Sequence, residues 1–293
     1  MMKDLAGKTV LLTGASGGLG TFMAHALADC GATLALVAFP GVELEELRVA
    51  LEKKGRRAIS FAADLREAAQ RALAVDRVCR ELGGIDVLVN NAGVEFPSVY
   101  HELTADNILD VLRVNLEAPM MLTWLVLPEM LRRHSGHIVN ISSLAGKSGP
   151  GYQEPYAATK AGLVAFTTSL RATYRGTGVS ASVVCPGFVE AGIYARLKAQ
   201  SGCTAPLLLG TSPPEPVARA VVRCIQRDLP EVIVNPLPVR PLFALTALFP
   251  SLGAWLVTRI GAHDFFRRAA QAQKKGPATH GDGRPGGSAS AQL

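Results

Sequence analysis

A short glycine-rich turn near the start of the chain constrains the fold more than any other feature. In the run KTVLLTGASGGLG, an apolar strand pattern at residues 8–12 leads into Gly14, Gly18 and Gly20, and the helical pattern TFMAHALADC follows. Glycine suits this turn because the backbone can bend tightly and let a diphosphate approach, while the amides and dipole of the helix N-terminus attract negative charge. The flanking strand and helix favour a nucleotide site over a turn without a ligand.

Strand-like and helical runs alternate along the rest of the chain. Apolar strand patterns recur at residues 33–38, 58–62, 85–89, 137–141, 179–184 and 231–234, with helical stretches between them. Near-continuous apolar strands separated by helices predict a doubly wound α/β fold, in which helices cover both faces of a parallel seven-stranded sheet. In this Rossmann fold the ligand crevice lies at the carboxyl ends of the strands. We expect residues 1–235 to form this single domain.

Tyr156 and Lys160 stand four residues apart in the helical run YAATK. Their side chains therefore leave the same face of the helix about one turn apart. A cation beside a phenol favours the phenolate and pulls the pKa of the tyrosine down from about 10. The pair is then able to exchange protons near neutral pH. Alone, the spacing equally suits an aromatic ring beneath a lysine stem on a surface helix.

The motifs together resemble the short-chain dehydrogenase/reductase family in order and spacing. The matching features are TGASGGLG, NNAG at residues 90–93, a helical Asn115, Ser143 thirteen residues before Tyr156, YAATK, and PGFV at residues 186–189. The resemblance covers residues 5–235 and implies an NAD(P)-dependent oxidoreductase that acts on a secondary alcohol or ketone.

The resemblance also implies a catalytic role for each of four residues. Tyr156 would be the general acid in reduction or the base in oxidation, and Ser143 would hydrogen-bond the reacting oxygen. Lys160 would lower the pKa of Tyr156 and bind the nicotinamide ribose. Asn115 would help to hold a water that links Lys160 to solvent.

Cofactor contacts carried over from the family lie after the predicted strands. They are Gly14, Ser16, Gly18, Leu19, Gly20, Phe39, Asp64, Leu65, Asn91, Ala92, Gly93, Tyr156, Lys160, Pro186, Gly187 and Val189. The resemblance places the glycines around the diphosphate, Asp64 and Leu65 against the adenine, and residues 186–189 beside the nicotinamide. Asn90 either sits beside the adenosine ribose or stabilises the central strands.

Three positions depart from the family pattern around the cofactor. The second strand ends in VAFP, with Phe39 where NAD-preferring relatives place an acid and NADP-preferring relatives place an arginine nearby. Gly17 also stands where NADP-preferring relatives often have a base. Without the acid a 2′-phosphate meets no repulsion, so the cofactor is NADP or NAD, with a slight lean to NADP. Ala191 replaces a usual threonine, and the lost hydrogen bond is worth about 1 kcal/mol.

The loops expected around the substrate carry little fixed charge. Residues 144–155 and 188–212 are rich in glycine, alanine, leucine and aromatic residues, which predicts an apolar lipid, steroid, retinoid or polyketide-like alcohol or ketone. Expected substrate contacts are Ser143, Tyr156, Glu95, Gln153 and Phe188. Glu95 is either a solvated loop charge or a polar contact for the substrate. Arg196 and Lys198 leave an acyl-thioester or anionic substrate open, unless both face solvent.

An apolar helical extension, residues 236–275, follows the last predicted strand. Its apolar part at residues 241–257 predicts two short helices joined at residues 249–251, and it is shorter than the about 20 residues that a bilayer-spanning helix needs. Residues 241–260 either cover the pocket, pack between subunits, or lie in a membrane surface, where basic flanks and Trp255 suit the interface. Residues 276–293 are predicted to be disordered.

Composition sets the remaining expectations. The net charge of +6 comes from 30 basic and 24 acidic residues, and half of it lies in residues 264–293, which indicates a charged tail rather than a nucleic-acid face. Five cysteines without CxxC spacing or grouping with histidine predict a cytoplasmic protein with reduced thiols and no metal site. No apolar stretch precedes the first strand, so no secretory signal is expected.

We expect a small-molecule substrate, no nucleic-acid partner, and the homodimer or homotetramer that is common in the resembling family. The alternative functions are a dinucleotide-binding sensor or scaffold without turnover, and a membrane-surface interaction protein. A sensor would be marked by a broken catalytic set, whereas all four residues are present here.

Overall fold

A seven-stranded parallel sheet forms the centre of the computed structural model, which describes residues 2, 4–207 and 209–275. The strands are β1 Thr9–Thr13, β2 Thr33–Ala38, β3 Ala58–Ala62, β4 Val87–Asn90, β5 Gly136–Ile141, β6 Val179–Pro186 and β7 Glu231–Val234. Their spatial order is β3-β2-β1-β4-β5-β6-β7. This confirms the predicted doubly wound fold, and the strand ends differ from the predicted ones by at most about two residues, as is usual for such assignments.

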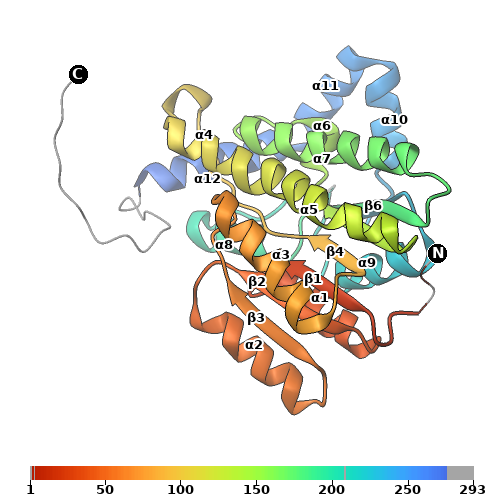
Figure 1. Ribbon diagram of the computed structural model, residues 1–293. Helices are drawn as coiled ribbons and strands as arrows, with labels where there is room; N and C mark the ends of the chain where they lie inside the picture. Colours follow the sequence, from red (N-terminus) through yellow and green to blue (C-terminus); the bar gives the residue numbers. More distant parts are fainter. Residues whose placement is uncertain (1, 3, 208, 276–293) are drawn as a thin grey trace, which may run out of the picture.

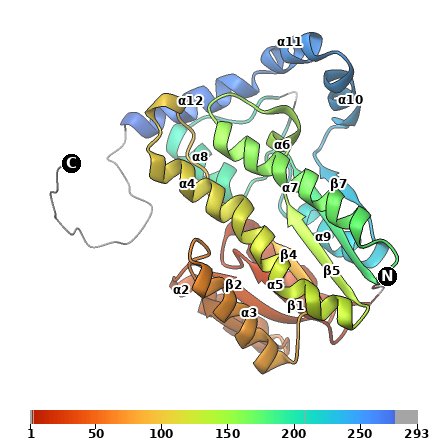
Figure 2. The same cartoon turned by 45° about the horizontal axis from the view of Figure 1, so that its top comes forward.

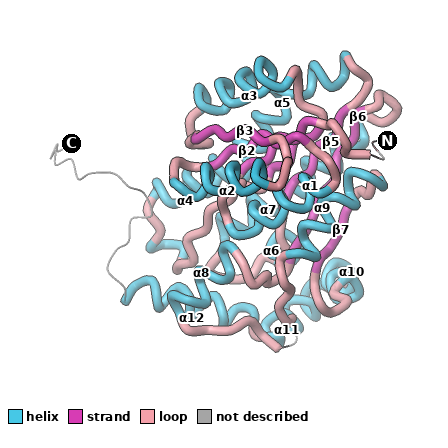
Figure 3. The backbone as a smooth tube through the Cα atoms, turned by 90° about the horizontal axis from the view of Figure 1, so that it is seen from below, coloured by secondary structure: helices cyan, strands magenta, loops and turns pink. Residues whose placement is uncertain are grey.

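Helices cover both faces of this sheet, with α3 and α5 on one side and α1, α2 and α9 on the other (Figure 1 and Figure 3). The α-helices are α1 Gly18–Asp29, α2 Val42–Lys53, α3 Ala68–Leu82, α4 Ala105–Leu112, α5 Ala118–Arg132, α6 Ala145–Ser148, α7 Glu154–Thr173, α8 Gly192–Ser201, α9 Glu215–Arg227, α10 Arg240–Leu248, α11 Pro250–Ile260 and α12 Ala262–Lys275.

Each central strand buries side chains on both faces, which explains why its sequence is apolar almost throughout. In β1, Val10 and Leu12 pack into the core beneath α1 and α9, whereas Leu11 packs into the core beneath α3 and α5. Successive side chains of a strand point to opposite faces of a sheet. A strand covered by helices on both sides therefore has no face left for polar residues.

The strand order reverses direction between β1 and β4. From β1 the chain winds outward through β2 and β3, and it then returns to β4 and winds the other way to β7. At such a switch point the loops after the two strands separate and leave a crevice at the carboxyl ends. The glycine turn after β1 and the NNAG segment after β4 both lie at this crevice.

Three helices follow β7. Figure 1 and Figure 2 show α10 and α11 as a blue hairpin at the edge of the molecule, and α12 returning beside α8. The hairpin bends at Phe249, within the predicted junction. Within the described part of the chain, no helix has the length and apolar character needed to cross a membrane. The tail predicted to be disordered, residues 276–293, lies outside the described residues.

Candidate active site

A cavity of about 250 Å³ opens at the switch point, at the carboxyl ends of the central strands. The predicted site residues that line it are Gly14, Gly18, Leu19, Gly20, Asn91, Ala92, Gly93, Glu95, Ser143, Gln153, Tyr156, Lys160, Pro186, Gly187, Phe188 and Val189. Four predicted cofactor contacts do not line this cavity: Ser16, Phe39, Asp64 and Leu65. A larger hollow of about 900 Å³ lies at the amino ends of β5 and β6 and contains none of the predicted residues.

The glycine turn is packed so tightly that side chains have no room. A Cβ on Gly20 would lie 2.0 Å from the carbonyl oxygen of Gly14, and one on Gly18 would lie 2.4 Å from the amide nitrogen of Gly192. Helix α1 begins here with Gly17 as N-cap and no capping side chain. Its first amides thus remain available to an anion, as a dinucleotide diphosphate requires. The residues present therefore fit a dinucleotide cofactor.

The NNAG segment at the end of β4 holds the glycine turn in place through hydrogen bonds. The side-chain amide of Asn91 donates to the carbonyl oxygens of Thr13 and Gly14, both at 3.1 Å. Asn90 instead donates from Nδ2 to Oδ1 of Asn140 on β5 at 2.8 Å, within the sheet. Of its two predicted roles, Asn90 therefore has the structural one, because its side chain joins two central strands.

Helix α7 presents Tyr156 and Lys160 on its buried face. Lys160 Nζ donates to the carbonyl oxygen of Ile141 at 2.9 Å and lies 5.5 Å from the centre of the Tyr156 ring. Ser142 Oγ donates to the backbone oxygen of Lys160 at 2.7 Å. Tyr156 is 9% exposed and Lys160 is 4% exposed. The surface-helix interpretation of this pair is therefore wrong, since both side chains face the interior of the crevice.

Burial dominates the acid–base properties of the pair. It lowers the pKa of Lys160 to about 8, although the nearby Glu95 carboxyl acts in the opposite direction. It also raises the pKa of Tyr156, and Glu95 raises it further, whereas the hydrogen bond with Ser143 lowers it. The sequence predicted a lowered Tyr156 pKa, which is wrong here because desolvation of the phenolate outweighs the neighbouring cation. Tyr156 is therefore protonated at neutral pH and able to donate.

Asn115 lies behind the cavity, fully buried, in a π-helical turn at Arg113–Glu117 between α4 and α5. Its Oδ1 accepts from the amide of Val94 at 2.8 Å, and its Nδ2 donates to the carbonyl oxygen of Val94 at 2.9 Å. A Cβ on Gly93 would have Asn115 Oδ1 at 3.4 Å and Lys160 Nζ at 3.6 Å. Asn115 therefore fixes the loop after β4 beside Lys160. Its expected role in holding a water that links Lys160 to solvent stays a prediction.

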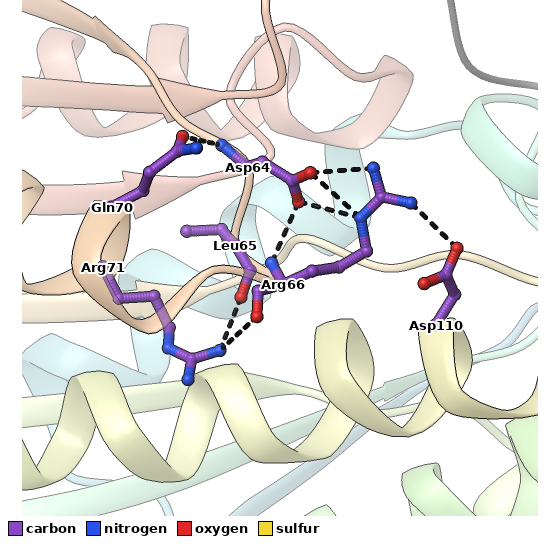
Figure 4. A network of polar contacts seen from close by, with 6 residues as sticks. All are labelled: Asp64, Leu65, Arg66, Gln70, Arg71 and Asp110. Carbon is purple, nitrogen blue, oxygen red and sulfur yellow. Dashed lines mark hydrogen bonds and ion pairs between the residues drawn. The ribbon is translucent and has the colours of Figure 1, made fainter. Parts of the chain in front are cut away.

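Polar contacts hold the loop after β3, where the adenine contacts were predicted (Figure 4). The Asp64 carboxylate accepts from Arg66 Nε at 2.9 Å and Nη2 at 2.7 Å, and Arg66 Nη1 donates to Asp110 of α4 at 2.8 Å. Arg71 Nη1 donates to the carbonyl oxygen of Leu65 at 2.7 Å. The Asp64 carboxylate is thus engaged with Arg66, and the Asp64 backbone amide donates to Gln70 Oε1 at 2.7 Å. The adenine contacts of Asp64 and Leu65 stay a prediction.

Arg66 also approaches the end of β2. Its guanidinium carbon lies 5.8 Å from the centre of the Phe39 ring, which is 49% exposed. The sequence around Phe39 contains no charged residue that could meet a cofactor phosphate. The charge near Phe39 comes from Arg66, which lies in the loop after β3 and is distant in the sequence. The parallel pairing of β2 with β3 brings the two loops together.

An aromatic cluster forms the outer wall of the cavity. The ring centre of Phe188 lies 5.3 Å from that of Tyr194 on α8, and 5.1 Å and 5.8 Å from those of Phe265 and Phe266 on α12. All four line the cavity. His263 Nδ1, also on α12, accepts from the amide of Gly151 at 2.8 Å and ties this helix to the loop before α7.

The sequence reasoning missed the residues of α12 that cover the pocket, and it named pocket cover only as one of three roles for residues 241–260. No described residue of α10 or α11 lines the cavity. A signal was available, because Phe265, Phe266, Ala269 and Ala270 are buried and share one face of a helix that is otherwise polar.

Glu95 is not a solvated loop charge. It is 3% exposed, its Oε1 has no hydrogen-bond partner, and burial raises its pKa to about 8. The solvated interpretation is wrong because the loop after NNAG turns inward beneath α8.

Of the two cations on α8, Lys198 pairs with Glu190 at 3.1 Å at the surface, and Arg196 Nη2 donates to the backbone oxygen of Glu95 at 3.4 Å. No metal-binding group of three or more acidic, histidine or cysteine side chains occurs among the described residues.

Comparison with known proteins agrees with this geometry. Residues 8–202 match the family model of the short chain dehydrogenases. The chain is 40% identical over 281 residues to the ketoacyl reductase HetN of Nostoc sp. (strain PCC 7120), covering 94% of this chain and 96% of that protein. It is 32% identical over 264 residues to a dehydrogenase/reductase SDR family protein 7-like of Drosophila melanogaster, covering 87% and 81%.

A solved structure is also similar. The crystal structure of a metagenomic short-chain oxidoreductase in complex with NADP superposes with a TM-score of 0.68 and 31% identity, covering 80% of this chain and 99% of the other. The predicted family is confirmed by these matches and by the sheet order. The chain belongs to the short-chain dehydrogenase/reductase family and is an NAD(P)-dependent oxidoreductase.

Proposed function

We propose that the protein reduces the ketone of an apolar substrate, of the lipid, steroid, retinoid or polyketide-like kind, or oxidises the matching secondary alcohol. The observation that carries this proposal is the position of Tyr156 and Ser143 in a cavity whose outer wall is aromatic. The nicotinamide supplies or accepts the hydride. Apolar walls favour an apolar substrate body because its transfer from water is favourable by about 25 cal/mol per Å².

Each polar group of the cavity has a proposed task. Tyr156 donates its proton to the carbonyl oxygen during reduction, and its raised pKa keeps that proton in place until the oxygen becomes basic. Ser143 Oγ accepts from the amide of Ala145 at 3.1 Å, which leaves its hydrogen to be donated toward the reacting oxygen. Lys160 binds the nicotinamide ribose, and Asn115 positions the loop that Lys160 contacts.

The cofactor contacts are proposed as the resemblance assigns them. The glycine turn, with Ser16 and Leu19, surrounds the diphosphate, and residues 91–93 border the ribose. Pro186, Gly187 and Val189 border the nicotinamide, and the loop after β3 meets the adenine. In support, the turn has free helix amides and the bordering segments line one cavity. Ser143, Tyr156 and Lys160 line that cavity and Asn115 is buried behind it. The presence of all four favours an enzyme over a sensor or scaffold without turnover.

A ketoacyl chain is the substrate type that we would test first, because a relative of 40% identity is named a ketoacyl reductase. The experiment is a cofactor-consumption screen over apolar ketones, ketoacyl thioesters and secondary alcohols, run with both nicotinamides. We expect turnover that rises with the length of the apolar chain. Turnover confined to small polar ketones would contradict the apolar substrate.

NADPH should bind more tightly than NADH. The end of β2 carries no acid to repel a 2′-phosphate, Arg66 lies beside Phe39 there, and the similar solved structure holds NADP. Fluorescence titration of both nucleotides measures the preference. Arg66→Gln should weaken the binding of NADPH more than the binding of NADH. Arg77→Gln, on the exposed side of α3, should change neither affinity. A clear NADH preference of the unaltered protein would overturn the assignment.

We further propose that the α10–α11 hairpin rests on a lipid surface. Leu248, Phe249, Leu252 and Trp255 are 73%, 57%, 44% and 54% exposed, so the hairpin presents large apolar side chains to its surroundings. Residues 236–263 contain two arginines and no acid, and the Arg259 guanidinium carbon lies 5.1 Å from the Trp255 ring centre. Aromatic and basic side chains beside an apolar face suit the interface of an anionic membrane.

Trp255 itself reports on this contact. The chain has two tryptophans, Trp124 and Trp255, so Trp124→Phe leaves Trp255 as the single emitter. With vesicles of mixed phosphatidylcholine and phosphatidylglycerol, its emission should shift to the blue and be quenched by brominated lipids, because the ring leaves water. Joint replacement Leu248→Asp and Phe249→Asp should prevent vesicle flotation, while Leu73→Asp, equally exposed on α3, should not.

The same variants separate a membrane from a second copy of the chain. Unchanged Trp255 emission with vesicles, together with a smaller particle by light scattering for the joint aspartate variant, would assign the hairpin to a subunit interface.

We propose a homodimer or homotetramer formed through other surfaces. Exposed Met120, Met121 and Trp124 on α5 support such a face. We place the protein in the cytoplasm, with its described cysteines as free thiols.

A further inference from the structure

Two polar side chains in the cavity are buried without partners. Glu95 and Gln153 are each 3% exposed, and each has an Oε1 atom that makes no hydrogen bond. They come from different elements, since Glu95 follows β4 and Gln153 is the N-cap of α7. Both line the cavity together with Tyr156. Two unpaired acceptors therefore converge on the space next to the proposed proton donor.

Their surroundings make this arrangement unfavourable unless a ligand completes it. Val94 and Phe96 pack with Tyr156 in an apolar cluster beside this part of the cavity. A buried oxygen without a donor loses its hydrogen bonds to water and gains nothing in return. Gln153 does not cap its helix, because no side-chain cap hydrogen bond forms there. No hydrogen bond of either Oε1 atom thus offsets the burial of these two side chains.

We propose that Glu95 and Gln153 form a polar subsite that binds a hydroxyl group of the substrate close to the reacting carbonyl. The inference rests on the proposed function and narrows its substrate class to hydroxylated apolar ketones, or the diols formed by their reduction. The aromatic wall of Phe188, Phe265 and Phe266 holds the apolar body, and the Glu95 carboxyl and the Gln153 amide hold the hydroxyl.

A hydroxyl matches these partners because it both donates and accepts one hydrogen bond. Burial raises the pKa of Glu95 to about 8, although Arg196 and Lys160 lower it, so the carboxyl is mostly neutral at pH 7. A neutral carboxyl donates through its O–H and accepts through its other oxygen. The amide oxygen of Gln153 accepts. A substrate without the hydroxyl leaves these groups unpaired, and such sites reject the incomplete substrate strongly.

A matched pair of substrates tests the inference. The probes are long-chain methyl ketones with and without one hydroxyl, moved stepwise along the carbons nearest the carbonyl. We expect the unaltered protein to favour one hydroxylated isomer by at least about 100-fold in kcat/KM, since sites of this kind reach about 10⁴-fold. Glu95→Leu should remove most of that preference, because leucine neither donates nor accepts.

Glu95→Gln should keep most of the preference, because an amide presents the same donor and acceptor as a neutral carboxyl. The matched control is Glu190→Gln, which removes a carboxylate that pairs with Lys198 at the rim, and it should leave the preference unchanged. Thermal melting and NADPH titration check that each variant retains its fold and cofactor site.

Failure of this inference and failure of the proposed function are distinguishable. If the unaltered protein reduces the plain and hydroxylated ketones with equal kcat/KM, the subsite is overturned and the ketone reductase stands. If it reduces no ketone while still binding NADPH, the proposed function itself is wrong. If Glu95→Leu fails to fold, the comparison of the two substrates on the unaltered protein still decides.

Discussion

Tyr156→Phe should lower kcat for every accepted ketone by about 10³-fold, while NADPH still binds. The change deletes one oxygen atom and keeps the ring, so the packing with Ile193 of α8 and with Val94 and Phe96 of the loop after β4 persists. A positioned general acid contributes about 10² to 10⁴-fold to a rate. Ser143 still donates a hydrogen bond to the developing alkoxide in this variant, so the expected loss lies in the middle of this range.

The measurement is steady-state turnover beside NADPH titration. Tyr174→Phe, at the other end of α7, is the matched control, because it deletes the same atom outside the cavity and should leave kcat unaltered. Near-normal turnover of Tyr156→Phe would remove this residue from the mechanism. Lost NADPH binding would instead show that the phenol is needed to build the site.

Gly20→Ala should destroy the cofactor site through a steric conflict that no side-chain rotation relieves. The added Cβ would stand 2.0 Å from the carbonyl oxygen of Gly14 and 2.8 Å from that of Ala15, both backbone atoms of the turn. Overpacking commonly costs about 1–3 kcal/mol, and a clash with backbone belongs at the upper end. We expect the melting temperature to fall by about 10 °C, given about 2–4 °C for each kcal/mol in a domain of this size.

Because α1 must move away from the turn, its first amides leave their positions, and NADPH affinity should fall by more than about 100-fold, the effect of losing two charge-assisted hydrogen bonds. Gly17→Ala is the control within the same turn, where the nearest atom to the new Cβ would be 3.3 Å away. The melting temperature of Gly17→Ala should be close to that of the unaltered protein. Equal behaviour of the two variants would mean that the turn adapts freely and does not fix the diphosphate.

Elements whose cause is local could be predicted from the sequence. The apolar run at β1 must be covered on both faces wherever it lies, so Val10, Leu11 and Leu12 indicated a buried parallel strand. Gly20 is required by atoms only five or six residues away, and Tyr156 and Lys160 are joined by one helical turn. These interactions act along the chain, and a linear pattern shows them directly.

Features that depend on residues far apart in sequence could not be predicted in this way. Arg66 meets Phe39 only because β2 and β3 pair in parallel. Phe265 and Phe266 reach the cavity only because α12 returns beside α8, whereas the sequence offered residues 241–260 as one possible cover. The pKa of Tyr156 was predicted in the wrong direction, since a spacing of four residues shows the nearby cation but not the loss of water.

The sequence by itself thus determined the sheet and the glycine turn, because each depends on backbone geometry over a short stretch of chain. Its motifs also identified the family, and the resemblance to that family supplied the catalytic candidates. Only the tertiary structure decided that Glu95 is buried and unpaired, which side chains close the pocket, and how the site is charged. The burial and the pKa of a group depend on all the residues packed around it in three dimensions. The order of residues along the chain does not show which residues these are.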